Sequence, residues 1–331
     1  MKRIDSKGYS IFLEIGDFSN LNCKKFEKVA ILVDENVKRL CLPILLEKCF
    51  FLKGVPIIEI KSGEENKNIN TCKVIWNFLL KYNFNRDSLL INLGGGVIGD
   101  IGGFAASTFK RGIQFIQIPT TLLAMSDASI GSKLGINFLN NKNQIGLFNN
   151  PQKVLINVEF LKTLPTNELM SGFAEVIKHA LIADEKYWNL LTKTPFKNLD
   201  WEDIIIRSIE IKNKIVMNDP LENNERKKLN FGHTLGHAIE SYYLERSETV
   251  LHGEALALGI ILETKLSKIS EYEIIKSFII KTFNIPKTPD ISELKKWLIH
   301  DKKNIDNKIN FTLLKKIGEC RINNYKSWNE L

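Results

Sequence analysis

The stretch Leu89–Phe104 reads LLINLGGGVIGDIGGF, and it decides the fold expected for the first half of the chain. Its apolar beginning, Leu89–Leu93, is typical of a buried β-strand, and the glycines that follow stand where this strand would turn into a helix. Glycines in such a turn let backbone N–H groups approach a phosphate, and the helix N-terminus favours the anion. The spacing is not G-x-G-x-x-G, so tight backbone packing explains the turn equally well.

Similar short apolar runs occur on both sides of this stretch, with helical patterns such as Lys67–Tyr82 between them. The other expected strands are Val29–Asp34, Pro56–Ile60, Phe115–Pro119 and Val154–Val158. Runs that are apolar on both faces and alternate with helices predict a parallel sheet covered on two sides.

The pattern changes after about Thr166, where one expected helix follows another. These helices are Asn167–Ala183, Trp201–Met217, Arg226–Leu244 and Gly253–Ile269, and a small strand is expected at Ile309–Leu314. A chain of 331 residues is also too long for one ordinary core. We therefore expect an α/β domain at residues 1–163 and a mostly α-helical domain at residues 164–331.

Composition limits the function classes. No apolar run reaches the roughly 18 residues that a membrane span needs, and the first residues do not resemble a signal peptide. The five cysteines include no C-x-x-C pair, which favours free thiols and a cytoplasmic location. The net charge of +8 comes from scattered residues without a basic stripe or interleaved aromatics, so nucleic acid is not an expected partner.

Three histidines indicate a metal site. His233 and His237 in NFGHTLGHAIE are four residues apart and share a helix face, and His252 follows in VLHGEALALG. Thr234 stands where zinc proteases carry their glutamate base. Both His233 and His237, one of them, or neither could bind a metal. Glu175 in GFAEVIKH is a candidate carboxylate ligand, although a solvated helix charge beside Lys178 would explain it as well.

Longer blocks together resemble the 3-dehydroquinate synthase family of the shikimate pathway. Their order and spacing agree from about Asp34 to Gly318. The blocks are GGGVIGDIGGFAASTFKRGIQFIQIPTTLLAMSDASIGSKLGIN, KNQIGLF, GFAEVIKHALI, LNFGHTLGHAIE and LHGEALALG. The resemblance implies a Rossmann-like NAD-binding domain, a helical metal- and substrate-binding domain with the active site in the cleft between them, and a homodimer.

Enzymes of this family are lyases that convert 3-deoxy-D-arabino-heptulosonate 7-phosphate to 3-dehydroquinate and phosphate. It uses NAD and one divalent metal ion, zinc or cobalt. The resemblance assigns the metal ligands to Glu175, His233 and His252, and acid–base work to His237. The remaining residues implied for catalysis or substrate binding are Asp127, Lys133, Asn143, Lys178, Lys212, Glu222, Arg226, Asn230 and Lys302, with Arg111 reaching the neighbouring subunit's site.

The resemblance also implies the NAD site. Its residues would be Asp34, Asn36, Glu64, Lys67, Gly95, Gly96, Val97, Asp100, Thr120, Thr121, Lys142, Phe160 and Thr163. For Asp34, a helix N-cap is an equally good explanation. The chain departs from the family pattern at Ser132 and Leu134, which replace a glycine and a threonine, and at Pro220.

Two alternatives share most of these features. Another sugar-phosphate cyclase would use the same NAD and metal apparatus, but Arg226 suits a substrate carboxylate that the inosose-forming cyclases do not bind. A metal-dependent polyol dehydrogenase of similar fold would release NADH into solution.

Overall fold

The structure is a computed structural model that describes residues 2–13, 18–139, 141–299 and 308–331. Lys302, one of the expected substrate residues, lies outside these ranges. The chain separates into two compact units, Met1–Pro165 and Thr166–Leu331. The sequence places the division between residues 163 and 164.

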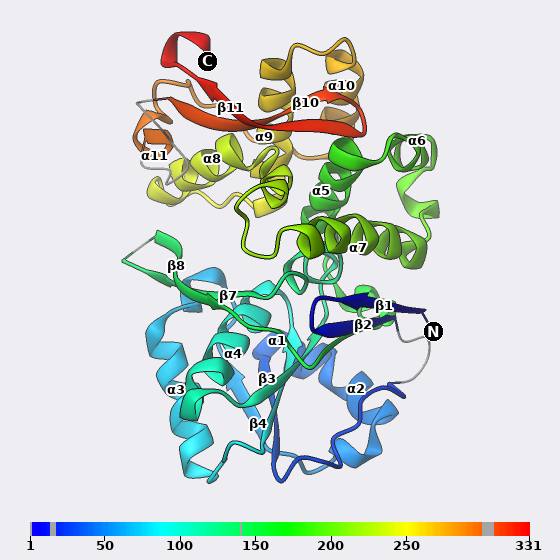
Figure 1. The fold of residues 1–331 in the computed structure, drawn as a ribbon, viewed down its shortest axis with the longest axis vertical. Coiled ribbons are helices and arrows are strands. Elements are labelled where there is room, and N and C mark those ends of the chain that lie inside the picture. The colour runs from blue at the N-terminus through cyan, green and yellow to red at the C-terminus, as the bar shows by residue number, and fades with distance from the viewer. Residues whose placement is uncertain (1, 14–17, 140, 300–307) are drawn as a thin grey trace. The chain divides into compact units, whose positions relative to one another are not determined.

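The first unit is built on a seven-stranded sheet in the order β1-β2-β9-β6-β5-β3-β4 (Figure 1). All neighbouring strands pair in parallel except the edge hairpin of β1 and β2. The strands are β1 (Lys2–Ser6), β2 (Tyr9–Leu13), β3 (Val29–Asp34), β4 (Ile57–Ile60), β5 (Leu89–Gly94), β6 (Gln114–Pro119) and β9 (Lys153–Ile156). The parallel sheet is confirmed, but the antiparallel edge hairpin was not expected.

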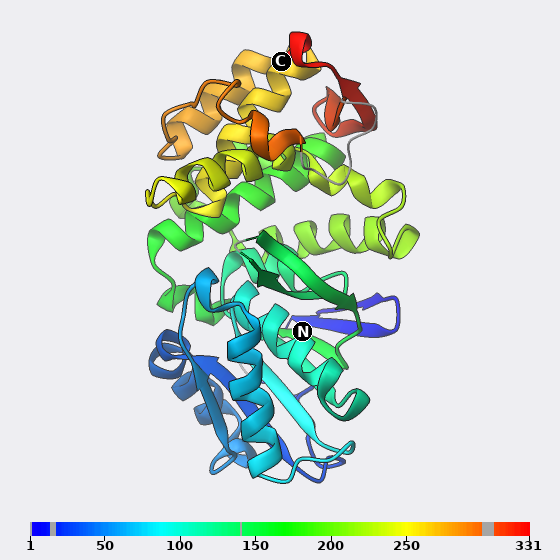
Figure 2. The same ribbon diagram turned by 90° about the vertical axis from the view of Figure 1, so that its left-hand side faces the viewer.

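Helices cover both faces of this sheet, which is why its central strands are mostly apolar and buried. All six residues of β5 are buried. Figure 1 shows α3 and α4 on one side of β3 and β4 and α2 on the other, and Figure 2 shows α3 and α4 in front of the strands. The helices are α1 (Glu35–Leu40), α2 (Leu42–Lys48), α3 (Ile69–Lys81) and α4 (Gly96–Thr108). The predicted stretch Lys67–Tyr82 corresponds to α3.

Glycine lets α4 lie very close to the sheet. A Cβ atom on Gly102 would stand 2.1 Å from the Oδ1 atom of Asn92 in β5, which is far inside van der Waals contact. Leu90, Ile101 and Ala105 join the core between the helix and the sheet. Close packing of this kind holds α4 against β5.

A separate hairpin, β7 (Lys133–Phe138) and β8 (Asn141–Phe148), was not expected from the sequence. Leu134 and Ile136 of β7 pack into the core beside α4, whereas every residue of β8 except Leu147 is exposed. A strand exposed on both faces has no apolar alternation, so the pattern that identifies strands is missing.

The second unit is mostly helical, as predicted. Its elements are α5 (Thr166–Ala183), α6 (Glu185–Lys193), α7 (Trp201–Asn218), α8 (His233–Glu245), α9 (His252–Ser267), α10 (Tyr272–Thr282), α11 (Lys295–Ile299), β10 (Ile309–Lys316) and β11 (Glu319–Lys326). The hairpin of β10 and β11 lies across α9 (Figure 1). Among the described residues, no helix is long and apolar enough to cross a membrane.

One predicted helix, Arg226–Leu244, is wrong. A 3-10 helix occupies Glu225–Asn230, and α8 begins only at His233. Gly232 separates the two with φ of 78°, a left-handed conformation that interrupts the helix and that glycine adopts without steric cost. The break places His233 in the first turn of its helix.

Candidate active site

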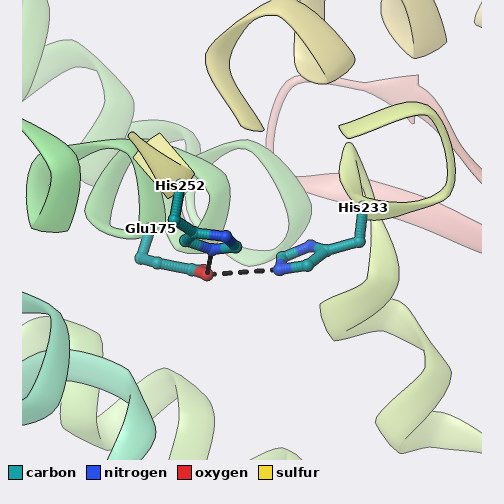
Figure 3. A group of neighbouring side chains, drawn as sticks. All are labelled: Glu175, His233 and His252. Carbon is teal, nitrogen blue, oxygen red and sulfur yellow. Dashed lines mark hydrogen bonds and ion pairs between the residues drawn. The ribbon is translucent and has the colours of Figure 1, made fainter. Parts of the chain in front are cut away.

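Three predicted ligands, Glu175, His233 and His252, meet in the second unit (Figure 3). The Nε2 atom of His233 lies 3.2 Å from the Oε1 atom of Glu175, and the Nε2 atom of His252 lies 3.3 Å from the same oxygen. Each residue comes from a different helix: Glu175 from α5, His233 from α8 and His252 from α9. Residues that are far apart in the sequence therefore offer one carboxylate and two imidazoles to one point.

A hydrogen bond joins the start of α9 to α5, one turn before Glu175. The backbone N–H of Gly253 donates to the Oγ atom of Ser171 at 2.9 Å. A Cβ atom on Gly253 would lie 2.3 Å from the Cα atom of Ser171, so only glycine allows this approach. The contact sets His252 beside Glu175.

The start of α8 is fastened to α9 in a similar way. Glu263 of α9 is fully buried, and its carboxylate accepts from the backbone N–H groups of Gly232 at 2.7 Å and Leu235 at 3.0 Å. A carboxylate at a helix N-terminus satisfies donors that have no partner within the helix. Gly259 completes the contact, because a Cβ atom there would lie 2.1 Å from the carbonyl oxygen of Gly232. No sequence pattern indicated this role for Glu263.

The burial and charge of this cluster suit a metal ion. Glu175 is 2% exposed and pairs with Lys178, which is equally buried, so a solvated helix charge does not describe it. Burial favours the neutral carboxyl, but Lys178 and His233 outweigh it and hold the pKa of Glu175 well below its usual range. Burial and the charge of Lys178 lower the pKa of His233, which favours the neutral, metal-binding ring.

The pKa of His252 is shifted in the opposite direction from that of His233. Burial opposes its charged form, but hydrogen bonding to Glu175 and Glu240 outweighs burial and raises the pKa of His252 to about 10. A carboxylate and two imidazoles are the donor set of catalytic zinc sites with an open fourth position. The residues present therefore fit one divalent ion.

His237 lies one turn after His233 and is exposed. The two rings are 5.0 Å apart between centroids, and His237 is 6.2 Å from His252. Glu240, a further turn on, has its Oε2 atom 3.7 Å from the Nδ1 atom of His252. Glu240 was not among the residues expected from the sequence, although its position three residues after His237 places it on the histidine face of the helix.

Arg226 is 2% exposed and is held in place by its own loop. Its Nη1 atom donates to the carbonyl oxygen of Pro220 at 2.6 Å, and its backbone N–H donates to Asp219 at 3.0 Å. The unusual Pro220 therefore takes part in fixing Arg226 through a carbonyl group that any residue would supply.

Lys212, on α7, is buried. Two other residues expected to act on the substrate, Glu222 and Asn230, contact each other. The Nδ2 atom of Asn230 donates to the Oε1 atom of Glu222 at 3.0 Å. Glu222 has φ of 62°, a backbone conformation that costs free energy for a residue other than glycine and often occurs at functional sites.

In the first unit, Lys67 joins residues expected to bind the cofactor and the substrate. Its ammonium group is 2.5 Å from the Oδ2 atom of Asp100 and 2.6 Å from the Oδ1 atom of Asn143, and Glu64 lies at 3.9 Å. Lys67 is 4% exposed. Burial would lower the pKa of Lys67, but Asp100 and Glu64 raise it above its usual value, so the lysine is charged.

Asn137 at the end of β7 ties this group to the hairpin. Its side chain donates to Glu64 at 2.9 Å and accepts from the backbone N–H of Asn143, also at 2.9 Å. Ser132, which replaces a family glycine, has φ of 60°, the left-handed conformation that a glycine would favour. Its hydroxyl donates to Asn150, and Leu134 packs into the core. The hairpin therefore accommodates both departures.

The glycine turn after β5 has the backbone geometry expected of a phosphate-binding turn. Gly95 is the N-cap of α4, and a Cβ atom on Gly94 would lie 2.6 Å from Ile98. The backbone N–H of Thr120 donates to the carbonyl oxygen of Gly94 at 3.0 Å. A long helix that begins after a glycine turn at the carboxyl end of a parallel strand fits a dinucleotide phosphate.

The other expected cofactor and substrate residues of this unit are distributed as follows. Asp34 accepts from the backbone N–H of Val37 as the N-cap of α1, so the capping role is real. Phe160 is fully buried. Three make hydrogen bonds: Asn36 with Ser62, Thr121 as the acceptor from Ala124, and Thr163 with Phe160. Gly96 and Val97 lie in the first turn of α4, and Asp127 lies in the π-helical turn Ala124–Ala128. Arg111, Lys133 and Lys142 are exposed.

Comparison with known proteins agrees with this arrangement. The family model described as 3-dehydroquinate synthase N-terminal matches residues 57–171, and the one described as 3-dehydroquinate synthase C-terminal matches residues 172–304. The 3-dehydroquinate synthase of Parabacteroides distasonis is 41% identical over 324 residues, which cover 94% of this chain and 90% of that protein. The chain belongs to the 3-dehydroquinate synthase family. This membership confirms the function and the lyase class predicted from the sequence. The comparisons do not favour another sugar-phosphate cyclase or a polyol dehydrogenase.

Solved structures show that the fold is shared beyond this family. A 2-deoxy-scyllo-inosose synthase complexed with carbaglucose-6-phosphate, NAD+ and Co2+ has a TM-score of 0.86 at 24% identity and covers 99% of this chain and 97% of its own. The 2-epi-5-epi-valiolone synthase of Streptomyces hygroscopicus with NAD+ and Zn2+ bound has a TM-score of 0.84 at 22% identity, with coverage of 100% and 96%. At these identities the likeness concerns the fold, and the site must be judged from its own residues.

Proposed function

We propose that the chain converts 3-deoxy-D-arabino-heptulosonate 7-phosphate to 3-dehydroquinate and phosphate, with NAD+ bound by the first unit and one divalent ion by Glu175, His233 and His252. The observation that carries the metal site is the approach of both imidazoles to the buried Glu175 oxygen, at 3.2 and 3.3 Å. The fold relatives that hold NAD+ with Co2+ or Zn2+ support both cofactors.

When bound, NAD+ takes up and returns a hydride, and the metal ion acts as a Lewis acid toward the substrate's hydroxyl oxygens. The residues of the chain hold and orient the reactants. A ring nitrogen of His237 moves a proton beside the metal ligands, and Glu222 accepts one. Lys212 and Arg226 bind the carboxylate, whereas Lys133, Asn143 and Asn230 bind the phosphate, with Asp127, Lys178 and Lys302 as further polar contacts.

The first unit would hold the cofactor through its glycine turn and the charged Lys67. The turn offers backbone N–H groups at the start of α4 to the pyrophosphate. The contacts of Lys67 with Asp100 and Asn143 would then fix the NAD-binding residues relative to a residue that binds phosphate. Residues 1–163 are accordingly proposed as the NAD-binding domain and residues 164–331 as the metal- and substrate-binding domain.

A turnover assay tests the proposed reaction. The protein is supplied with the heptulosonate phosphate, a divalent metal and NAD+ in an amount far below that of the substrate. Release of phosphate together with an equal amount of dehydroquinate is expected. NADH that accumulates in step with substrate loss would instead indicate a polyol dehydrogenase, and preference for a phosphorylated sugar without a carboxylate would indicate another cyclase.

Arg226→Ala is expected to raise KM for the heptulosonate phosphate at least about 30-fold, because a charge-assisted bond to a carboxylate contributes about 2 kcal/mol or more. NAD+ affinity should stay unchanged, since Arg226 belongs to the second unit. Steady-state kinetics and equilibrium NAD+ binding measure the two effects. Arg207→Ala, which removes a partly exposed arginine paired with Asp203, is the matched control. Equal losses of substrate and NAD+ affinity would contradict the carboxylate role.

A homodimer is proposed in which Arg111 enters the neighbouring subunit's site. Lys110 and Arg111 both have positive φ, 50° and 68°, ahead of Gly112 at 114°. Two consecutive residues held in this conformation form a strained turn, and such strain is common where a side chain must be presented for function. A cytoplasmic location is proposed as well, because all five cysteines are buried free thiols.

Complementation between variants tests the shared site. Arg111→Ala and His252→Ala proteins, each inactive alone, are expected to regain up to about a quarter of wild-type activity when they are mixed under conditions that exchange subunits. One of the two sites in each heterodimer would then be intact, in keeping with a symmetric dimer. Heterodimers demonstrated by mass spectrometry but without restored turnover would refute the exchange of Arg111.

A further inference from the structure

We propose that Glu240 is a positioning residue for the metal ligand His252, which it holds in the tautomer that can bind the ion. This inference rests on the metal site of the proposed function and adds a residue to it. The two nitrogens of His252 face two different carboxylates. Its Nε2 atom lies 3.3 Å from Glu175, and its Nδ1 atom lies 3.7 Å from Glu240.

The chemistry of imidazole makes the second carboxylate significant. A neutral histidine carries one proton, and a ring that offers the lone pair of Nε2 to a metal must keep this proton on Nδ1. A carboxylate beside Nδ1 accepts that proton in a hydrogen bond, orients the ring and makes Nε2 a better donor. Metal-bound histidines commonly have such a carboxylate partner, and its loss typically weakens metal binding 10- to 100-fold.

The position of Glu240 suits this role better than that of a surface charge. Its side chain is 12% exposed, and it lies two turns after His233 on the same helix, α8. The donor atoms of His237, Glu240 and His252 all lie within 4.8 Å of one another. Glu240 thus reaches from α8 to the first residue of α9, and Glu263 reaches from α9 to the first turn of α8. The two contacts together fix the spacing of His233 and His252.

Titration of the metal-free protein with Co2+ tests the inference without the use of turnover. Glu240→Gln is expected to bind one equivalent of Co2+ 10- to 100-fold more weakly than wild type, with a changed visible absorption of the bound ion. Glu245→Gln is the matched control, because it removes the same charge from the same helix at a residue that pairs with the distant Lys296. The control should bind Co2+ as wild type does, and the metal-free unfolding midpoints of all three proteins should agree.

Three results would overturn the inference. Unchanged Co2+ affinity in Glu240→Gln would show that His252 needs no carboxylate at Nδ1. An equal loss in Glu245→Gln would show a general charge effect. Two equivalents of Co2+ in wild type and one in Glu240→Gln would make Glu240 a metal ligand itself. Failure of the metal site is recognised separately, because His252→Ala would then bind Co2+ as tightly as wild type.

Discussion

His252→Ala is expected to lower metal-dependent turnover at least about a thousandfold while NAD+ binding stays within a factor of two of wild type. The substitution removes one of the three proposed ligands, and a bound Lewis acid contributes several kcal/mol to transition-state stabilisation, where each 1.4 kcal/mol is tenfold in rate. The expected NAD+ residues all belong to the first unit, whereas His252 begins α9 in the second. Steady-state turnover with saturating metal and NAD+ binding by calorimetry measure the two quantities.

Lys265→Ala provides the control for this experiment. Lys265 is exposed in the last turn of the same helix, so its loss should leave both turnover and NAD+ affinity unchanged. Wild-type turnover in His252→Ala after thorough chelation and metal replacement would contradict the metal role. A comparable loss of NAD+ affinity would show that the substitution disturbs more than the ligand.

Glu175→Ala is expected to destabilise the metal-free protein by about 3–5 kcal/mol, because it leaves a buried lysine without its carboxylate partner. Glu175 and Lys178 are each 2% exposed and form an ion pair within one turn of α5. A buried charge that loses its counter-charge retains its full desolvation cost. Urea unfolding at neutral pH, followed by far-ultraviolet circular dichroism, measures the free energy of unfolding of the unit.

Two further variants separate this effect from the loss of helix or packing. Glu319→Ala removes a half-exposed glutamate that pairs with Lys315 at 2.7 Å, and such surface pairs are worth at most about 1 kcal/mol. Combining Glu175→Ala with Lys178→Met removes both buried charges and should recover most of the lost stability. If Glu175→Ala cost no more than Glu319→Ala, the buried pair would not carry the stability assigned to it.

The central elements could be predicted from local patterns because each keeps a regular pattern of buried and exposed side chains along its length. The run Val29–Asp34 is β3 to the residue, and Trp201–Met217 differs from α7 only at its last residue. The exposed β8 was missed because its side chains do not alternate between core and solvent. The break before α8 was missed because the apolar helical spacing runs through Gly232, which is left-handed and where a Cβ atom would lie 2.6 Å from Ile260 of α9.

The sequence by itself determined the family, the two-part organisation and the residue types of the proposed metal site, because long blocks and local periodicity are properties of the chain. Tertiary structure alone decided that Glu175 is buried against Lys178, that Glu263 caps α8 and that Glu240 faces His252. The last two depend on glycines that bring α8 and α9 into backbone contact. Contacts between distant segments, and the burial and charge effects that follow from them, exist only in the packed structure, so a local sequence pattern does not predict them.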